Sequence, residues 1–200
     1  MLRPATSHAG SSRTPTSRTT PLEVDSIVDA ACMIIERDGL AGLSMRKLGR
    51  ELSVDPMAVY HHVPNKRTLL ALVTARTIGT METPDPDAEW DAWVRQWAIG
   101  YWEVATANRD LILAGMSDPD IGAGGLPSTR QLIAAIARSG LPKPLVEPSA
   151  FIVVDAVHGA ALGVAAVSDR SEDQSNAKRV FEVGLDMILS GIAARARSES

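Results

Sequence analysis

The sequence of 200 residues is poor in cysteine and in aromatic residues, which make up 4% of the chain. A single cysteine, Cys32, excludes an intrachain disulfide framework and a metal site with several cysteine ligands. Cys32 lies in an apolar helical pattern, so we interpret it as a packed small side chain rather than a nucleophile or a redox sensor. No apolar run approaches the roughly 20 residues that a membrane-spanning helix needs, and no apolar segment follows Arg3 and Arg13. We therefore expect no secretory signal, no membrane partner and a cytoplasmic location.

Positive charge is scarce but concentrated. The net charge of −4 argues against a nucleic-acid partner, yet the local distribution matters more than the sum. Residues 44–67 carry five Lys and Arg side chains against Glu51 and Asp55, whereas the chain after Thr80 is acid-rich. Residues 1–20 hold three arginines, no acid and many Ser, Thr and Pro residues, which predicts a disordered arm. Such an arm either reaches into a DNA minor groove or adds charge near phosphates.

Two helices are predicted before residue 53. Apolar residues recur at helical spacing over 21–37, and Gly39 follows where a left-handed C-cap belongs. Ser44 is a predicted N-cap of the second helix, with Leu43 and Leu48 placed as a hydrophobic staple.

A third, short helix begins in the sequence DPMAVYHHVPN. Asp55 is a predicted N-cap and Pro56 occupies the first helical position, where its missing N–H costs nothing. Pro64 stops this helix, and Asn65 caps a fourth one. A short helix, a turn of about three residues and another short helix form the helix-turn-helix pattern, whose second helix enters the DNA major groove.

The third helix carries unusual side chains for a core element. With Val59 turned inward, Met57, Tyr60 and His61 project outward, and Pro56 and Ala58 offer apolar contacts suited to thymine methyl groups. Donors for phosphate oxygens are Tyr60, His61, His62 and Lys66. The alternatives are a metal pair at the two histidines and a merely solvated basic face. The first is disfavoured, because adjacent helical residues point about 100° apart and no third ligand is near.

The stretch IVDAACMIIERDGLAGLSMRKLGRELSVDPMAVYHHVPNKRTLLALV resembles the DNA-binding domain of the tetracycline-repressor family. The resemblance implies an all-α homodimer: an N-terminal three-helix helix-turn-helix domain binds a palindromic operator, and a helical-bundle domain binds a small ligand and dimerises. We expect a disordered arm at 1–20, the DNA-binding domain at 21–67 and the ligand-binding and dimerisation domain at 68–200. One departure is Ser53, where the family usually has Gly. Ser must accept a less favourable backbone conformation or shift the turn.

By motif position, this resemblance also places the family's DNA contacts. Arg46 is the best candidate for a bidentate contact to guanine, since its fork matches the two acceptors on that base. The full set is Ser44, Arg46, Pro56, Met57, Tyr60, His61, His62 and Lys66.

An aromatic stripe follows the turn-rich segment TPDPDAE. Trp90, Trp93, Trp97 and Tyr101 recur at i, i+3, i+7 and i+11, a spacing typical of a core face. The alternative is that part of the stripe lines a ligand cavity. The resemblance places Trp97 and Tyr101 at pocket-lining positions. Family members that bind magnesium–tetracycline use a histidine near residues 107–120, which contain none here, so we expect neither that ligand nor any metal or other cofactor.

The rest of the chain predicts one loop and two long helices. Residues 117–128, SDPDIGAGGLPS, read as a loop that is either a pocket entrance, a hinge or an ordinary surface loop. Helices are predicted over 149–167 and 176–196; the first is apolar nearly all round, which predicts burial on several sides. Together they form half of an intermolecular four-helix bundle. A C2 dimer then sets two recognition helices about 34–36 Å apart.

Asp155 and His158 share a face of the first of these helices. They either orient a polar ligand or satisfy one another inside the bundle, and we favour the second interpretation. Candidate ligand-binding residues are Trp93, Trp97, Tyr101, Met116, Asp155 and His158. No Ser-His-Asp arrangement or Gly-rich phosphate loop is present, so we do not expect an enzyme.

These observations favour a ligand-responsive transcriptional repressor. Its effector is unidentified, and the aromatic stripe indicates an apolar or aromatic compound. The competing hypothesis is an activator or a ligand-independent DNA-binding regulator, which would keep the helix-turn-helix but lack ligand-dependent release from DNA.

Overall fold

The structure, a computed structural model, describes the backbone of residues 22–167 and 171–198 and the side chains of 22–163 and 175–198. The predicted arm at 1–20 lies outside the described residues. The helices of the described part are α1 (Val24–Gly42), α2 (Met45–Glu51), α3 (Pro56–His62), α4 (Lys66–Ile78), α5 (Trp90–Ala107), α6 (Arg109–Ser117), α7 (Pro119–Gly122), the 3-10 helix η1 (Ala123–Gly125), α8 (Leu126–Ala137), α9 (Lys143–Val167) and α10 (Ser171–Ser198).

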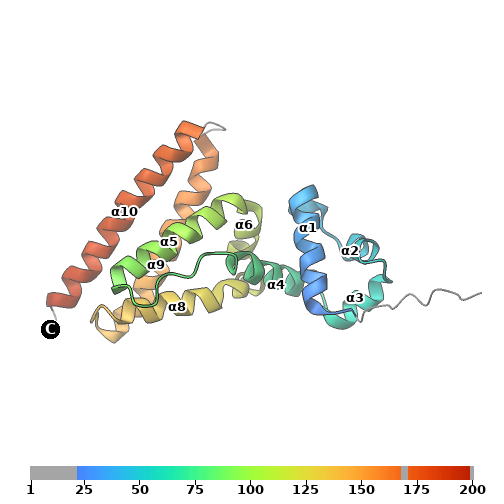
Figure 1. Cartoon of the computed structure of the whole chain (residues 1–200), viewed down its shortest axis with the longest axis horizontal. Coiled ribbons are helices and arrows are strands. Elements are labelled where there is room, and N and C mark those ends of the chain that lie inside the picture. Colours follow the sequence, from blue (N-terminus) through green and yellow to red (C-terminus); the bar gives the residue numbers. More distant parts are fainter. Residues whose placement is uncertain (1–21, 168–170, 199–200) are drawn as a thin grey trace, which may run out of the picture.

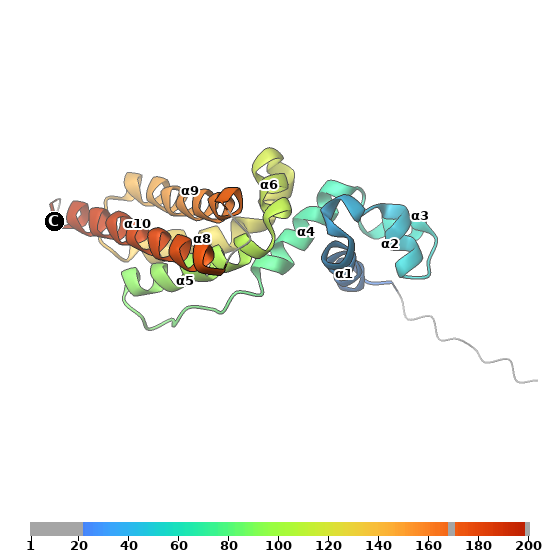
Figure 2. The same ribbon diagram turned by 90° about the horizontal axis from the view of Figure 1, so that it is seen from above.

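The molecule is elongated, with two packed units at opposite ends (Figures 1 and 2). We call α1–α3 with the first half of α4 the head, and α5, α8, α9 and α10 the bundle. The segment α6, α7 and η1, here named the connector, packs against α4 between them. This arrangement confirms the predicted all-α fold, with an N-terminal helix-turn-helix followed by a helical bundle.

The head is held by a small apolar core and by ion pairs between its helices. Leu48, Val59 and Val63 are fully buried in that core. Arg37 of α1 donates to both carboxylate oxygens of Glu51 on α2, at 3.3 and 3.0 Å. These contacts fix α2 against α1.

Helix α4 joins the two units. Leu69, Leu70 and Val73 lie in the core of the head, whereas Ile78 lies in the core of the bundle. A single helix therefore contributes to both cores. The domain boundary after residue 67 stays a prediction.

The bundle core is built around the aromatic stripe of α5. Trp97 is 2% exposed, and Trp93 and Tyr101 are also buried. Trp102, the residue after Tyr101, stacks on Phe181 of α10, with ring centroids 6.1 Å apart and planes 12° from parallel. The expectation that the stripe is a core face is confirmed.

The prediction of a loop at residues 117–128 is wrong. This segment forms α7, η1 and the beginning of α8. Asp118 caps α7 by accepting a hydrogen bond from the backbone N–H of Asp120 at 3.1 Å, and Pro119 occupies the first turn. This is the same Asp-Pro start that opens α3 at Asp55. The high Gly and Pro content of the segment favoured the prediction of a loop over that of a helix.

The two long helices begin earlier than predicted, at Lys143 and Ser171. Pro148 is the sixth residue of α9, so its missing N–H costs this helix one intrahelical hydrogen bond. The expectation that no run is long and apolar enough to cross a membrane is wrong for Lys143–Gly163 of α9, by length and composition alone. In this fold that segment packs against α5, α8 and α10.

Gly39 adopts the expected positive φ of 72°, but its ψ of 170° lies outside the left-handed helical region. The main run of α1 is interrupted there, and a further helical turn continues to Gly42. Leu43 then follows in extended conformation, buried beneath the start of α2.

Candidate functional site

Three side-chain caps set where the short helices of the head begin. Ser44 Oγ accepts from the N–H of Lys47 at 3.2 Å, and Asp55 Oδ1 accepts from the N–H of Met57 at 2.7 Å. Asn65 Oδ1 accepts from the N–H of Thr68 at 2.9 Å. All three predicted caps are confirmed, so α2, α3 and α4 start at positions fixed by local chemistry.

The turn between α2 and α3 is tight. Ser53 has a φ of 56°, so it takes the less favourable left-handed conformation rather than shifting the turn. Gly49 of α2 is buried against the start of α3, and a Cβ there would lie 3.1 Å from both Pro56 N and Val54 O. The two helices therefore pack at a distance that a larger residue at 49 would increase.

The outer face of α3 exposes the side chains that sequence analysis singled out. Val59 is fully buried, whereas Met57 is 62% and Tyr60 is 41% exposed. His61 and His62 are exposed, and Pro56 is half-buried. Val59 thus anchors the helix, and Met57, Tyr60, His61 and His62 face outward.

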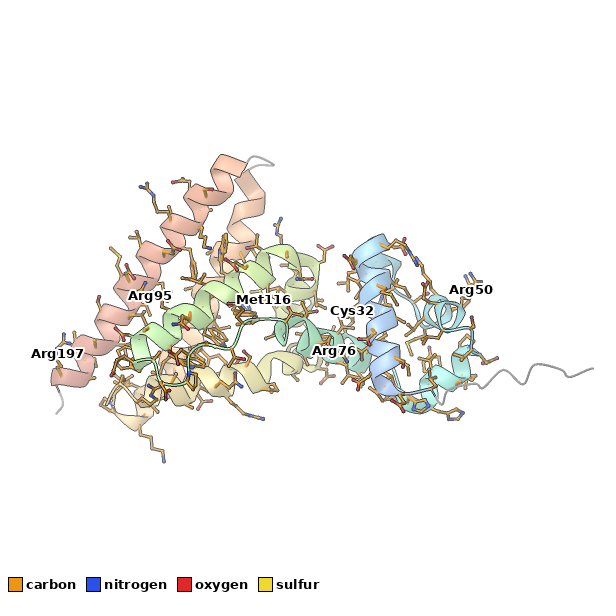
Figure 3. The ribbon with its side chains drawn as sticks, in the orientation of Figure 1. Cys32, Arg50, Arg76, Arg95, Met116 and Arg197 are labelled. Atoms are coloured by element: carbon orange, nitrogen blue, oxygen red, sulfur yellow. The ribbon has the colours of Figure 1, made fainter. Side chains whose placement is uncertain are left out.

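Cations around this face differ in their partners. Lys47 pairs with Asp38 at 2.7 Å, and this contact, with that of Arg37, lowers the pKa of the Asp38 carboxyl. By contrast, Arg46 and Arg50 of α2 are exposed, and within the described residues neither has an ion pair. Arg50 points outward at the far end of the head (Figure 3). These two arginines are available to an external anion.

Lys66, at the start of α4, is directed toward the junction of α1 and α2. Its Nζ donates to the backbone carbonyl of Leu43 at 2.7 Å, which ties α4 to that junction. An ammonium group has three donors, so two remain for a phosphate. Ser44 similarly uses its hydroxyl oxygen as a cap acceptor and keeps its O–H to donate.

A cavity of about 90 Å³ lies where α4, α5, the connector and α9 meet. Of the candidate ligand residues, Tyr101, Met116 and His158 line it. Met116, on α6, is 55% exposed, so it stands at the border between cavity and solvent. Three different helices therefore bring these residues together.

Tyr101 and His158 form the polar centre of this cavity. The Tyr101 hydroxyl and His158 Nε2 are 2.7 Å apart, and the two rings meet edge to face with centroids 5.5 Å apart. Burial raises the pKa of Tyr101 to about 12. Burial also lowers the pKa of His158, an effect that the charge of Asp155 partly opposes. Both groups are neutral at neutral pH.

The remaining ligand candidates do not meet at this cavity. Trp97 lines a neighbouring hollow of about 290 Å³, and its indole N–H donates to Ser128 Oγ at 2.9 Å. Trp93 is a buried core residue, and Asp155 is exposed. The favoured pairing of Asp155 with His158 is wrong: within the described residues no hydrogen bond joins them, and His158 instead bonds Tyr101 across the bundle.

Sequence reasoning missed the connector. Leu111 of α6 and Ile121 of α7 are buried in the core of the head, although they follow α5 in the chain. η1 packs so closely on α4 that a Cβ at Gly124 would overlap the carbonyl oxygen of Ala71 and lie 2.9 Å from Thr74 Cβ. The Asp-Pro cap at residue 118 was the signal available in the sequence.

An ion pair adds to this junction. Arg67 Nε of α4 lies 2.8 Å from Asp118 Oδ2, at the N-terminus of α7. The connector lines the cavity on one side and contacts the head on the other. The connector is thus in contact with both the cavity and the core of the head.

Residues 27–73 match a family described as "Bacterial regulatory proteins, tetR family". Among curated proteins, the HTH-type transcriptional repressor DrrR1 of Streptomyces coeruleorubidus is 32% identical over 136 residues, which cover 67% of this chain and 50% of DrrR1. The chain thus spans about half the length of this relative.

Solved structures with this fold include BioQ of Mycobacterium smegmatis, at 27% identity and a TM-score of 0.73 over 87% of this chain and 99% of BioQ. BioQ has also been solved with its double-stranded DNA operator. ActR of Streptomyces coelicolor in complex with actinorhodin is 25% identical, with a TM-score of 0.72 over 88% of this chain and 99% of ActR. The head, the connector and the bundle therefore share one known architecture.

Proposed function

This chain belongs to the tetR family of bacterial regulatory proteins, and on that premise we propose that it is a ligand-responsive transcriptional repressor. As a homodimer it binds a palindromic operator in double-stranded DNA, and a small molecule in the bundle releases it. It acts in the cytoplasm and is not an enzyme. Operator binding by BioQ and ligand binding by ActR support the two halves of this proposal.

The DNA-binding half rests on the outward face of α3 together with Arg46 of the neighbouring helix α2. Met57 and Tyr60 are exposed on a helix anchored by buried Val59, and Arg46 has no ion pair within the described residues. A guanidinium group left free at the base-reading end of a helix-turn-helix suits the two acceptors of guanine. The proposed DNA contacts are Ser44, Arg46, Pro56, Met57, Tyr60, His61, His62 and Lys66.

Exposed apolar side chains on the bundle support a homodimer. Phe151 and Ile152 of α9 are 44% and 54% exposed, and Val180, Val183 and Met187 of α10 are 62%, 53% and 71% exposed. Large exposed apolar faces mark interaction sites. A second copy packing its own α9 and α10 on these faces completes a four-helix bundle and sets the two heads for successive major grooves.

Release from DNA requires that the ligand bind one spacing of the heads more tightly than the other. The connector supplies the link, since Leu111 of α6 lines the cavity and is also buried in the core of the head, where Ile121 of α7 lies as well. A ligand that displaces the connector shifts α4 and with it the helix-turn-helix.

Binding-site selection from random duplex DNA tests the DNA-reading assignment. The wild type should enrich a palindrome, and an Arg46→Ala, Tyr60→Ala double variant should not, because a good bidentate contact is worth about 1–3 kcal/mol of base discrimination. Arg95→Ala is a matched control, since Arg95 lies on α5 and pairs with Asp186 of α10, far from the head. If neither wild type nor control enriches a sequence, the proposal fails.

A further inference from the structure

The lining of the cavity beside Tyr101 has no charged side chain among the described residues. It consists of aliphatic side chains and glycines, together with Met116, Thr74, Tyr101 and His158. The Thr74 hydroxyl already donates to the carbonyl of Leu70 at 2.9 Å. The Tyr101–His158 pair is therefore the principal polar group that the cavity offers.

This pair can either accept or donate a hydrogen bond. If Tyr101 donates to His158 Nε2, the phenolic oxygen keeps lone pairs for a ligand hydroxyl. If His158 carries its proton on Nε2 and donates to Tyr101, the phenolic O–H is free for a ligand carbonyl. Tyr101 is 7% exposed, so a ligand group that bonds to it must lose its own hydration.

An ionised ligand is disfavoured at such a site. Burying a charge without a partner costs far more than burying a hydroxyl or carbonyl that forms a hydrogen bond. The interdomain cleft of about 690 Å³ differs in this respect, because Glu36, Arg109 and Asp110 line it. Charged small molecules would favour the cleft, and uncharged ones the cavity.

We propose that the effector is an uncharged ring compound bearing a hydroxyl or carbonyl group, and that the Tyr101–His158 pair recognises this group. This rests on the proposed function, because it concerns the ligand of the same regulatory site. Aromatic rings fit the surroundings, since the rings of Tyr101 and His158 line the cavity and meet edge to face with centroids 5.5 Å apart.

The cavity also has to enlarge when it is filled. Its volume of about 90 Å³ is smaller than the roughly 150 Å³ of an engineered cavity that holds benzene. Met116 is the exposed, flexible side chain of the lining, and it belongs to α6 of the connector. Ligand entry therefore displaces the connector, the element that contacts α4.

Four matched probes test the ligand class on the full chain without DNA: 2-naphthol, naphthalene, 2-naphthoate and 2-(aminomethyl)naphthalene. Isothermal titration calorimetry at neutral pH should find 2-naphthol bound about tenfold or more tightly than each of the others, the equivalent of one satisfied hydrogen bond. Equal or tighter binding of either charged probe in competition with 2-naphthol, and therefore at the cavity rather than at the cleft, overturns the proposal. So does undetectable binding of 2-naphthol up to about 1 mM.

Two tyrosine variants test the recognising group. Tyr101→Phe keeps the ring and should remove the preference for 2-naphthol over naphthalene. Tyr60→Phe, the matched loss of a hydroxyl on the outer face of α3, should retain that preference in the absence of DNA. A preference that survives in a folded Tyr101→Phe protein, as monitored by circular dichroism, overturns the assignment.

Failure of the ligand class and failure of the proposed function are distinguishable. If 2-naphthol binds through Tyr101 but does not weaken binding to the selected operator, the ligand class stands and ligand-responsive repression fails. If a charged probe releases the operator instead, repression stands and the ligand class is overturned.

Discussion

The head and the bundle present opposite chemistry to their surroundings. Around α2 and α3 the head exposes Arg46, Arg50 and the ring of Tyr60, whereas the bundle cavity is neutral and centred on the Tyr101–His158 hydrogen bond. The first surface suits a polyanion and the second an uncharged molecule. The comparison teaches that the two binding surfaces of one chain select different ligands by their charge and by the cost of removing them from water, as well as by their positions.

The two units also differ in what determines their helices. In the head, Ser44, Asp55 and Asn65 each cap a helix through a side chain. In the bundle, α5 and α8 begin without a side-chain cap, and their large buried side chains determine how they pack. Substitutions in the bundle should therefore cost more stability than substitutions at the turns of the head.

The largest expected effect is at Trp97. Trp97→Ala should lower the free energy of unfolding by about 3–5 kcal/mol, because it leaves a cavity in the bundle core and unpairs Ser128. Urea denaturation at fixed protein concentration measures this. Trp90→Ala, at the half-buried start of α5, is the control. A loss at Trp97 no larger than at Trp90 would contradict this contrast.

The next effect is a pH dependence from the bundle. Burial holds the pKa of His158 below its unfolded value of about 6.5, so in the window just below 6.5 the unfolded chain binds a proton that the folded protein does not. Stability should therefore fall as pH drops through this window, by at most about 1.4 kcal/mol per pH unit.

Thermal unfolding between mildly alkaline and mildly acidic pH measures the dependence. Asp155 and Tyr101 are the groups that act on His158, and both remain in a His158→Gln variant. That variant should show a flatter profile. An unchanged slope would contradict the assignment of the dependence to His158.

The smallest effect belongs to the turn of the head. Ser53→Gly should raise the free energy of unfolding by about 0.5–1 kcal/mol, since Gly adopts a φ of 56° without the steric cost that a Cβ brings. Ser53→Ala keeps that cost and serves as control. Chemical denaturation of both variants decides the matter, and a Ser53→Gly protein less stable than Ser53→Ala would be inconsistent with the left-handed turn.

These differences explain which parts could be predicted from the sequence. The starts of α2, α3 and α4 depend on residues within three positions of each cap, so local patterns sufficed. The partner of His158 could not be found that way, because Tyr101 is 57 positions away in the chain. Helical spacing pointed to Asp155 instead, since it lies three residues before His158 on the same helix. The sequence therefore identified Tyr101, Met116 and His158, which line the cavity, but not the hydrogen bond between Tyr101 and His158.

The connector shows a different limit. Its Gly and Pro residues indicated a loop, but Ile121 is buried in the core of the head and the Asp118 cap is formed. The Gly and Pro content of the segment favoured a loop, although Asp118-Pro119 is the same type of helix start as Asp55-Pro56. Which core a helix of four residues joins depends on tertiary packing, which no local pattern contains.

The central claim is that the packing of the connector against α4 determines the position of the head. Gly124→Ala should force η1 away from α4, because a Cβ there overlaps the backbone of Ala71, without altering any proposed DNA contact. Gly100→Ala is the control, since its Cβ would meet only Met81 Cε at 3.7 Å.

Fluorescence anisotropy with the selected operator gives the decisive comparison between these two folded variants. The account predicts that Gly124→Ala weakens operator binding about 5–150-fold relative to Gly100→Ala, the usual range of coupling between sites. Equal operator affinities in the two variants would contradict it.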